Sequence, residues 1–226
     1  VIRIDQQPAP VPAPSPTPTP TPTPNVRSRA DFDGDGRTDV SVFRASTGTW
    51  YLQRSSQGFS AVSFGASSDI PVPGDFDGDG KADISVFRAS TGTWYRLYSS
   101  NNAFVGIQFG ANGDTPQPGD FDGDLKDDIA VWHASNGTWY SLNSSNGRSI
   151  SVNFGQNGDQ PVGGDYDGDG RDDLSVFRPS NGIWYRLNSN TSTFVSIAFG
   201  VSTDMAVPAD YDGDNRDDIC VFRPSN

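Results

Sequence analysis

The chain has 226 residues, a formal net charge of −12 and a hydrophobic content of 34%. All 28 acidic residues are Asp, and the chain also contains 25 Gly and 17 Pro. This composition is typical of short strands joined by tight turns, because Asp, Gly and Pro favour turns over helices. The 16 basic residues are not clustered, which argues against binding to nucleic acid or to an anionic membrane. No apolar run approaches the roughly 20 residues of a membrane-spanning helix, so no membrane insertion is expected.

Two segments precede the main part of the chain. Residues 1–7 contain a short β-prone stretch, Val1–Asp5. Residues 8–25 alternate Pro with Ala, Val, Ser or Thr, which favours an extended polyproline II linker. As in mucin-like stalks, four threonines of this linker are candidate O-glycosylation sites: Thr17, Thr19, Thr21 and Thr23.

A single unit of about 45 residues repeats over residues 26–226, which we expect to form one domain. In the second unit, β-prone segments cover residues 70–76, 84–88, 93–98 and 104–109, separated by turn residues. Four short antiparallel strands in a unit of this length are typical of one propeller blade. The chain holds four complete units, at residues 26–65, 69–110, 114–155 and 159–200, and a partial fifth.

The strands carry apolar and aromatic residues on both faces, as in Val86-Phe87 and Trp94-Tyr95. A blade packs against neighbours on both faces, whereas a sandwich strand keeps one face wet. We therefore predict an all-β fold, a β-propeller-like array of four-stranded antiparallel blades. A linear array of β-units remains an alternative.

An Asp-rich loop recurs in every unit. Loops 1 to 5 read DFDGDGRTD (31–39), DFDGDGKAD (75–83), DFDGDLKDD (120–128), DYDGDGRDD (165–173) and DYDGDNRDD (210–218), with Asp at positions 1, 3, 5 and 9. Several carboxylates in one tight loop suit a hard cation that takes six to eight oxygen ligands, such as Ca²⁺. These loops are not EF-hands, because position 12 is Val in all five, where an EF-hand needs a bidentate Glu.

The pattern D-x-D-x-D-G-x-x-D before a hydrophobic strand resembles the calcium loops of FG-GAP and VCBS-type repeats, as in the propeller of integrin α-subunits. The Phe-Gly pair of these repeats is present as well, for example at Phe64-Gly65 and Phe109-Gly110. The resemblance covers residues 26–226 and implies up to five bound Ca²⁺ ions. It implies side-chain ligation at positions 1, 3, 5 and 9 and a backbone carbonyl ligand at position 7. The implied ligands are Asp31, Asp33, Asp35, Arg37 and Asp39; Asp75, Asp77, Asp79, Lys81 and Asp83; Asp120, Asp122, Asp124, Lys126 and Asp128; Asp165, Asp167, Asp169, Arg171 and Asp173; and Asp210, Asp212, Asp214, Arg216 and Asp218.

Two loops depart from the pattern at position 6. Leu125 and Asn215 replace a Gly there, where the loop is expected to need a positive φ. Asn tolerates that conformation and Leu does not readily. Loop 3 is therefore the site that fits the pattern least well.

Catalysis finds little support in the sequence. The only His, His133, stands where the other units have Arg, and no G-x-S-x-G motif, Cys-His pair or Glu is present. We expect the chain not to be an enzyme. The recurring Trp-Tyr pairs fit an inter-blade core better than a sugar-stacking platform, because they recur at one slot of each unit.

Our leading hypothesis is an extracellular, calcium-stabilised structural or adhesive repeat protein. In this hypothesis it assembles head to tail with copies of itself into a surface fibre, through residues 1–7, and contacts glycans or cell-surface proteins. The alternatives are a lectin-like or ligand-binding propeller and a non-catalytic targeting module of a larger secreted protein. Glycan binding by monomers favours the lectin, whereas calcium-dependent polymerisation favours the fibre.

Overall fold

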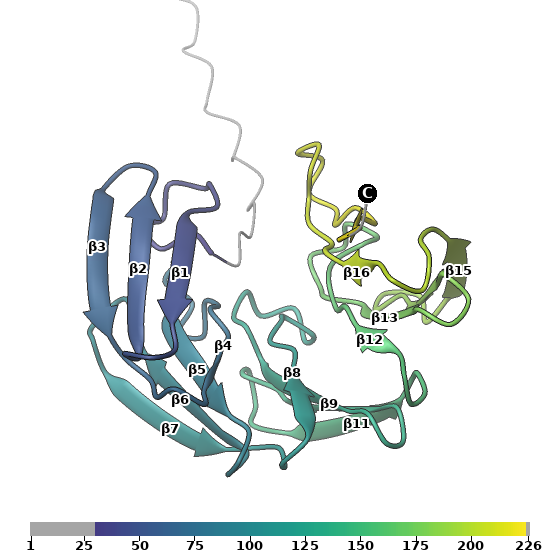
Figure 1. Ribbon diagram of the computed structural model, residues 1–226, viewed down its shortest axis with the longest axis horizontal. Helices are drawn as coiled ribbons and strands as arrows, with labels where there is room; N and C mark the ends of the chain where they lie inside the picture. Colours follow the sequence, from purple (N-terminus) through teal and green to yellow (C-terminus); the bar gives the residue numbers. More distant parts are fainter. Residues whose placement is uncertain (1–29, 225–226) are drawn as a thin grey trace, which may run out of the picture.

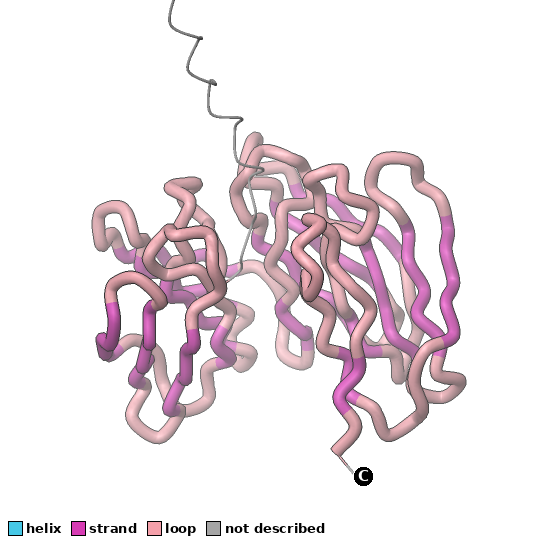
Figure 2. The backbone as a smooth tube through the Cα atoms, turned by 90° about the horizontal axis from the view of Figure 1, so that it is seen from above, coloured by secondary structure: helices cyan, strands magenta, loops and turns pink. Residues whose placement is uncertain are grey.

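The structure is a computed structural model that describes residues 30–224 (Figure 1). The segments 1–7 and 8–25, with their four candidate threonines and the proposed assembly segment, lie outside the described residues. Residues 30–224 contain strands, turns and loops only (Figure 2). In this part of the chain no helix long and apolar enough to cross a membrane is found.

The strands form five antiparallel sheets, which we call blades 1 to 5. Blade 1 contains β1 (Val40–Arg44), β2 (Thr49–Arg54) and β3 (Gly58–Ser63). Blades 2, 3 and 4 have four strands each: β4 (Ile70–Pro71), β5 (Ile84–Arg88), β6 (Thr93–Leu97) and β7 (Phe104–Gln108); β8 (Asp114–Pro116), β9 (Ile129–His133), β10 (Thr138–Leu142) and β11 (Ser149–Asn153); and β12 (Gln160–Pro161), β13 (Leu174–Arg178), β14 (Ile183–Leu187) and β15 (Phe194–Ala198). Blade 5 pairs β16 (Met205–Ala206) with β17 (Val221–Phe222).

The blades follow one another around an arc (Figure 1). The short strands β4, β8, β12 and β16 lie toward the inside of the arc, and β3, β7, β11 and β15 lie on its outside. The predicted all-β, propeller-type fold is confirmed. Blade 1 shows three strands among the described residues, because its expected innermost strand falls before Ala30.

The hydrophobic core is divided among the interfaces between consecutive blades. At the first interface, Trp50 and Leu52 of blade 1 pack with Ile84 and Val86 of blade 2. Equivalent clusters lie at the three following interfaces. Each inner blade therefore buries apolar residues on both faces, as the paired bulky residues of the sequence predict. Val42 of β1, which no described blade covers, is 58% exposed, whereas its equivalent Val86 is fully buried.

The recurring tryptophan of each blade is a core residue. Trp94 is fully buried, and its indole N–H donates to the carbonyl oxygen of Phe109, the Phe of the Phe-Gly pair, at 2.9 Å. Trp50, Trp139 and Trp184 make the same bond. A buried indole needs such an acceptor. The interpretation of the Trp-Tyr pairs as inter-blade core is thus confirmed for their Trp members.

Candidate metal sites

Loops 2 to 5 each connect the innermost strand of a blade to the next strand, as loop 2 joins β4 to β5, and loop 1 precedes β1. The loop turns tightly because its glycines adopt positive φ, with Gly78 at 80° and Gly80 at 83°. The carboxylate at position 1 holds this turn from inside. In loop 2, the Asp75 carboxylate accepts the backbone N–H groups of Gly78 at 2.7 Å and Gly80 at 2.9 Å.

The structure brings the predicted carboxylates together in all five loops. In loops 1, 2, 3 and 5, oxygens from positions 1, 3 and 9 lie within 4.8 Å of one another. In loop 4 the corresponding group is formed by positions 1, 3 and 5. The position-9 carboxylate of that loop, Asp173, lies 3.9 Å from the guanidinium of Arg186. Three carboxylate oxygens converging on one point repel one another unless a cation or protons lie between them.

The position-5 carboxylate lies at the rim of the loop in loops 1, 2, 3 and 5 and outside the grouped oxygens. It accepts the backbone N–H of position 7, as Asp79 does from Lys81 at 2.9 Å. The position-7 residue was expected to offer its carbonyl oxygen. Its amide orients position 5, and its carbonyl remains a candidate ligand.

Burial changes the acidity of the position-9 carboxylates. Asp83 and Asp128 are fully buried, and this desolvation raises the pKa of each to about 7, with the position-3 carboxylate acting in the same direction. The pKa of Asp173 rises to about 6 for the same main reason. Backbone N–H donors oppose these shifts but do not cancel them. A bound cation would stabilise the ionised form of each group.

The aspartates at position 3 provide direct evidence that the loops suit a metal ion. One carboxylate oxygen, Oδ1, of Asp33, Asp122 and Asp167 is buried and has no hydrogen-bond partner. A buried oxygen of an ionised carboxylate without a partner is costly. The three aspartates that carry these oxygens belong to the groups that converge within their loops. The donor set therefore fits a hard cation that is ligated by oxygen.

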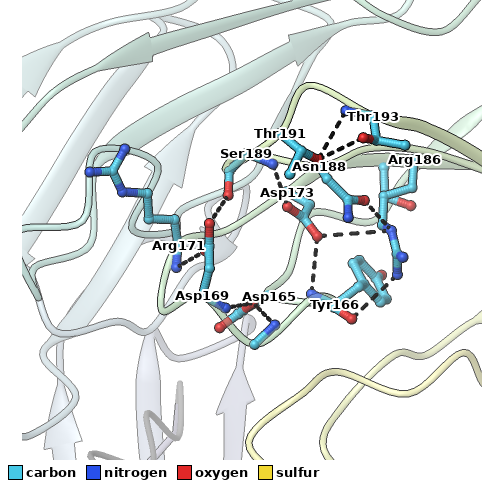
Figure 3. Close-up of polar contacts among 12 residues, drawn as sticks. Asp165, Tyr166, Asp169, Arg171, Asp173, Arg186, Asn188, Ser189, Thr191 and Thr193 are labelled. Carbon is cyan, nitrogen blue, oxygen red and sulfur yellow. Dashed lines mark hydrogen bonds and ion pairs between the residues drawn. The ribbon is translucent and has the colours of Figure 1, made fainter.

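Sequence reasoning missed a serine pair that holds the loop from outside. In blade 2, the turn after β6 brings Ser99 and Ser100 onto loop 2. The Ser99 amide donates to Asp83 Oδ1 at 2.7 Å, its hydroxyl to Asp79 Oδ2 at 2.7 Å, and the Ser100 hydroxyl to Asp77 Oδ2 at 2.6 Å. The same first serine recurs 24 residues after each loop start, as Ser55, Ser99, Ser144 and Ser189. Figure 3 shows Ser189 between Asp169 and Asp173 in loop 4. This constant spacing was the available signal.

Neighbouring loops are also joined to one another. The position-8 amide of each loop donates to the position-1 carbonyl of the preceding loop, as Asp127 does to Asp75 at 2.7 Å. The basic side chain at position 7 lies against the position-4 glycine of the preceding loop; a Cβ on Gly78 would meet Lys126 Cε at 2.8 Å. Loops 1 to 4 are thereby each in contact with a basic side chain from the next blade.

A second series of buried Asp residues, also missed, occurs in blades 2 to 5. Asp69, six residues before loop 2, accepts hydrogen bonds from Nε and Nη2 of Arg88 at 2.8 and 2.9 Å. Asp159 with Arg178 and Asp204 with Arg223 repeat this pair. In blade 3, His133 pairs with Asp114 in its place. The interpretation of His133 as a repeat-position variant agrees with this arrangement.

Position 6 has a positive φ in loop 3 although it is not glycine there. Leu125 has φ 71° and is 51% exposed. Its left-handed backbone conformation is unfavourable for a Leu, and the limited burial of its side chain offsets little of that cost. We expect Leu125→Gly to raise the free energy of unfolding by about 1 kcal/mol. The converse change, Gly80→Leu, places a side chain in open space and is expected to lower the free energy of unfolding by a similar amount. Denaturant titration at saturating calcium measures both; a destabilised Leu125→Gly variant would contradict the strain.

The sequence model of the FG-GAP-like repeat matches residues 31–86, 75–131 and 165–221. No curated protein matches the chain. Among solved structures, a streptogramin B lyase aligns with a TM-score of 0.51 and 13% identity over 80% of this chain and 58% of that one. Virginiamycin B lyase from Staphylococcus aureus aligns with a TM-score of 0.51 and 13% identity over 81% and 60%.

The chain thus spans less than two thirds of either lyase. At this level of identity the likeness shows the propeller fold alone and does not decide whether the chain is an enzyme. The repeat matches cover more than half of the sequence and include loops 1 to 5 in whole or in part. The chain belongs to the family of FG-GAP-like repeat proteins.

Proposed function

We propose that the chain is a calcium-stabilised structural or adhesive propeller module that acts outside the cell. The observation that carries the metal part is the convergence of carboxylate oxygens in every loop, together with the buried, unpartnered position-3 oxygens of loops 1, 3 and 4. Turn chemistry alone requires neither feature, because a carboxylate that only caps a turn directs its oxygens to backbone N–H groups.

The chemistry of the ligand atoms indicates which metal the loops would bind. Every ligand offered by the loops is an oxygen, and no His or Cys belongs to any group. Zinc prefers nitrogen and sulfur ligands, whereas Ca²⁺ takes six to eight oxygens in flexible geometry. Three or four carboxylates with one carbonyl leave room for water in such a shell.

The role proposed for the metal is structural. The carboxylates of a loop are already fixed by backbone amides and by the serine turn, as in loop 2. They are positioned to hold an ion and are not presented to a substrate. Five Ca²⁺ ions would also offset most of the net charge of −12.

A calcium titration of metal-free protein tests this proposal. We expect calorimetry to show at least four bound Ca²⁺ per chain and no competition from an equal concentration of Zn²⁺. Asp77→Asn and Asp122→Asn, each at position 3, should each remove about one site. Absence of calcium uptake, or uptake of Zn²⁺ in preference, would reject the metal assignment.

The extracellular location is supported by the family and by the choice of calcium. The head-to-tail fibre depends on Val1–Asp5, outside the described residues, and it remains a prediction. The lectin-like and targeting alternatives also remain open, although the buried tryptophans do not offer a stacking platform for sugars.

A further inference from the structure

A cavity of about 200 Å³ opens between blades 3 and 4. Its lining includes the aromatic rings of Phe121 and Trp139 and the side chain of Leu187, with Ser141 and Asn143 as polar members. It is larger than the roughly 150 Å³ apolar cavity that holds a benzene molecule. The cavity between blades 4 and 5 is much smaller, with a volume of about 10 Å³.

The cavity exists because one side chain is short. The second residue after the blade tryptophan points into the space between neighbouring blades: it is Leu52 in blade 1, Arg96 in blade 2 and Arg186 in blade 4. Leu52 and Arg96 are 4% and 6% exposed, and the Arg96 guanidinium lies over the ring of Phe76 at 5.1 Å. Blade 3 has Ser141 at this slot. The cavity is therefore the space that a long side chain fills elsewhere.

The contacts of Arg186 show what this slot recognises (Figure 3). Its Nε donates to Asn188 Oδ1 at 2.7 Å and lies 3.9 Å from Asp173 Oδ2. Its guanidinium carbon lies 5.3 Å from the centre of the Tyr166 ring. The slot thus combines an amide oxygen, a carboxylate and an aromatic face, the three partners that suit a planar guanidinium.

Blade 3 retains all three partners and lacks only the arginine. Phe121 stands at the position of Tyr166, Asn143 at that of Asn188 and Asp128 at that of Asp173. The Asn143 side-chain oxygen receives only a long 3.5 Å contact from the Ser141 hydroxyl.

A carboxylate and a cation from blade 4, Asp172 and Arg171, also line the cavity. Arg171 stands at position 7 of loop 4. A basic residue at this position is compatible with a guanidinium in the slot of the preceding blade, because blades 2 and 4 combine Arg96 and Arg186 with Lys126 and Arg216 at position 7 of the following loop.

We propose that the cavity between blades 3 and 4 binds a guanidinium group supplied from outside the chain, which takes the place of the missing arginine side chain. The group lies on the Phe121 ring and donates to Asn143 Oδ1, as Arg186 does to Asn188. It is carried either by a free small molecule or by an arginine side chain of a partner. Binding involves no covalent step.

The test uses calorimetry with calcium-saturated protein and n-propylguanidinium as the probe. We expect binding, and binding at least about tenfold weaker for the neutral isostere n-propylurea. Binding of the peptide Gly-Arg-Gly that is tighter than that of the probe assigns the source to a partner's side chain, and weaker binding assigns it to a free molecule. No binding of the probe, or equal binding of the urea, would overturn the proposal.

Two variants locate the site. Ser141→Arg supplies the chain's own guanidinium, so it should abolish probe binding and raise the melting temperature. The matched control, Ser151→Arg, adds the same charge on an exposed strand position outside the cavity lining and should bind as the parent does. If Ser141→Arg does not fold, Asn143→Ala decides, because its backbone bonds are retained and only the acceptor is lost. Unchanged binding in either variant would place the probe elsewhere and reject the site.

Discussion

Excess chelator should lower the melting temperature of this protein by about 10–20 °C relative to saturating calcium. Each site that binds calcium only in the folded state stabilises it by about 2.7 kcal/mol when free calcium exceeds the dissociation constant 100-fold. Two such sites, fewer than the four or more expected, already give about 5 kcal/mol, and for a chain of this size 1 kcal/mol shifts the midpoint by about 2–4 °C, so this range is a lower bound. The physical cause is the crowding of carboxylates within 4.8 Å in each loop. Differential scanning calorimetry with and without chelator measures the shift.

The control for this experiment separates calcium binding from general screening. Sodium chloride at matched ionic strength screens exposed charges but does not enter a buried group of oxygens. It should therefore restore only a small part of the lost midpoint, whereas added calcium should restore all of it. An identical melting curve with and without chelator would mean that the loops are ordinary turns.

The repeat and its strands could be predicted because their signals are local. The expected strands at 84–88, 93–98 and 104–109 agree with β5, β6 and β7 within one residue at each end. Adjacent bulky residues such as Val86 and Phe87 predicted burial on both faces, and both are fully buried. The innermost strand was predicted as residues 70–76 but covers only Ile70–Pro71. Pro73 has no N–H for a ladder, and pairing resumes only as an isolated bridge between Gly74 and Asp83.

The support around the candidate sites could not be predicted, because it comes from residues far apart in the sequence. Ser99 and Ser100 look like ordinary turn formers, and only folding places them against the carboxylates of loop 2, 16 to 23 residues away. The role of Asp69 was hidden for the same reason, since its partner Arg88 lies 19 residues further on. The serines and the Asp–Arg pairs both recur with the period of about 45 residues, but a period alone does not show which residues are in contact.

The cavity between blades 3 and 4 shows what departures from a repeat reveal. Ser141 is an ordinary strand residue when it is considered alone. Its importance becomes clear only when it is compared with Arg96 and Arg186, which occupy the same repeat position in blades 2 and 4. His133 and Leu125 are further departures of the same unit. The Asp loops shared by all repeats carry the candidate metal sites, whereas a difference between repeats draws attention to a candidate site in one blade.

Removing the position-9 carboxylate of loop 2 should destabilise the protein far more than removing its position-5 carboxylate. Asp83 is fully buried and accepts the amides of Phe76 at 3.0 Å and Ser99 at 2.7 Å, so Asp83→Ala leaves two backbone donors unpaired and removes a candidate ligand. We expect a loss of about 3 kcal/mol or more at saturating calcium. Asp79→Ala removes the same charge from the same loop, but at an exposed position, and should cost less than about 1 kcal/mol.

Because both changes remove one carboxylate, the difference between them excludes the effect of net charge and reports burial, the additional amide bond and the loss of a candidate ligand. Denaturant titration of the two variants beside the parent gives both values. Equal losses would show that Asp83 contributes only its charge, and that the serine turn is held onto the loop by other contacts. If Asp83→Ala causes the larger loss and that loss becomes smaller in chelator, Asp83 has two roles. The loss of unfolding free energy that remains in chelator reports its contacts within the protein, and the loss that disappears reports its contribution to the bound ion.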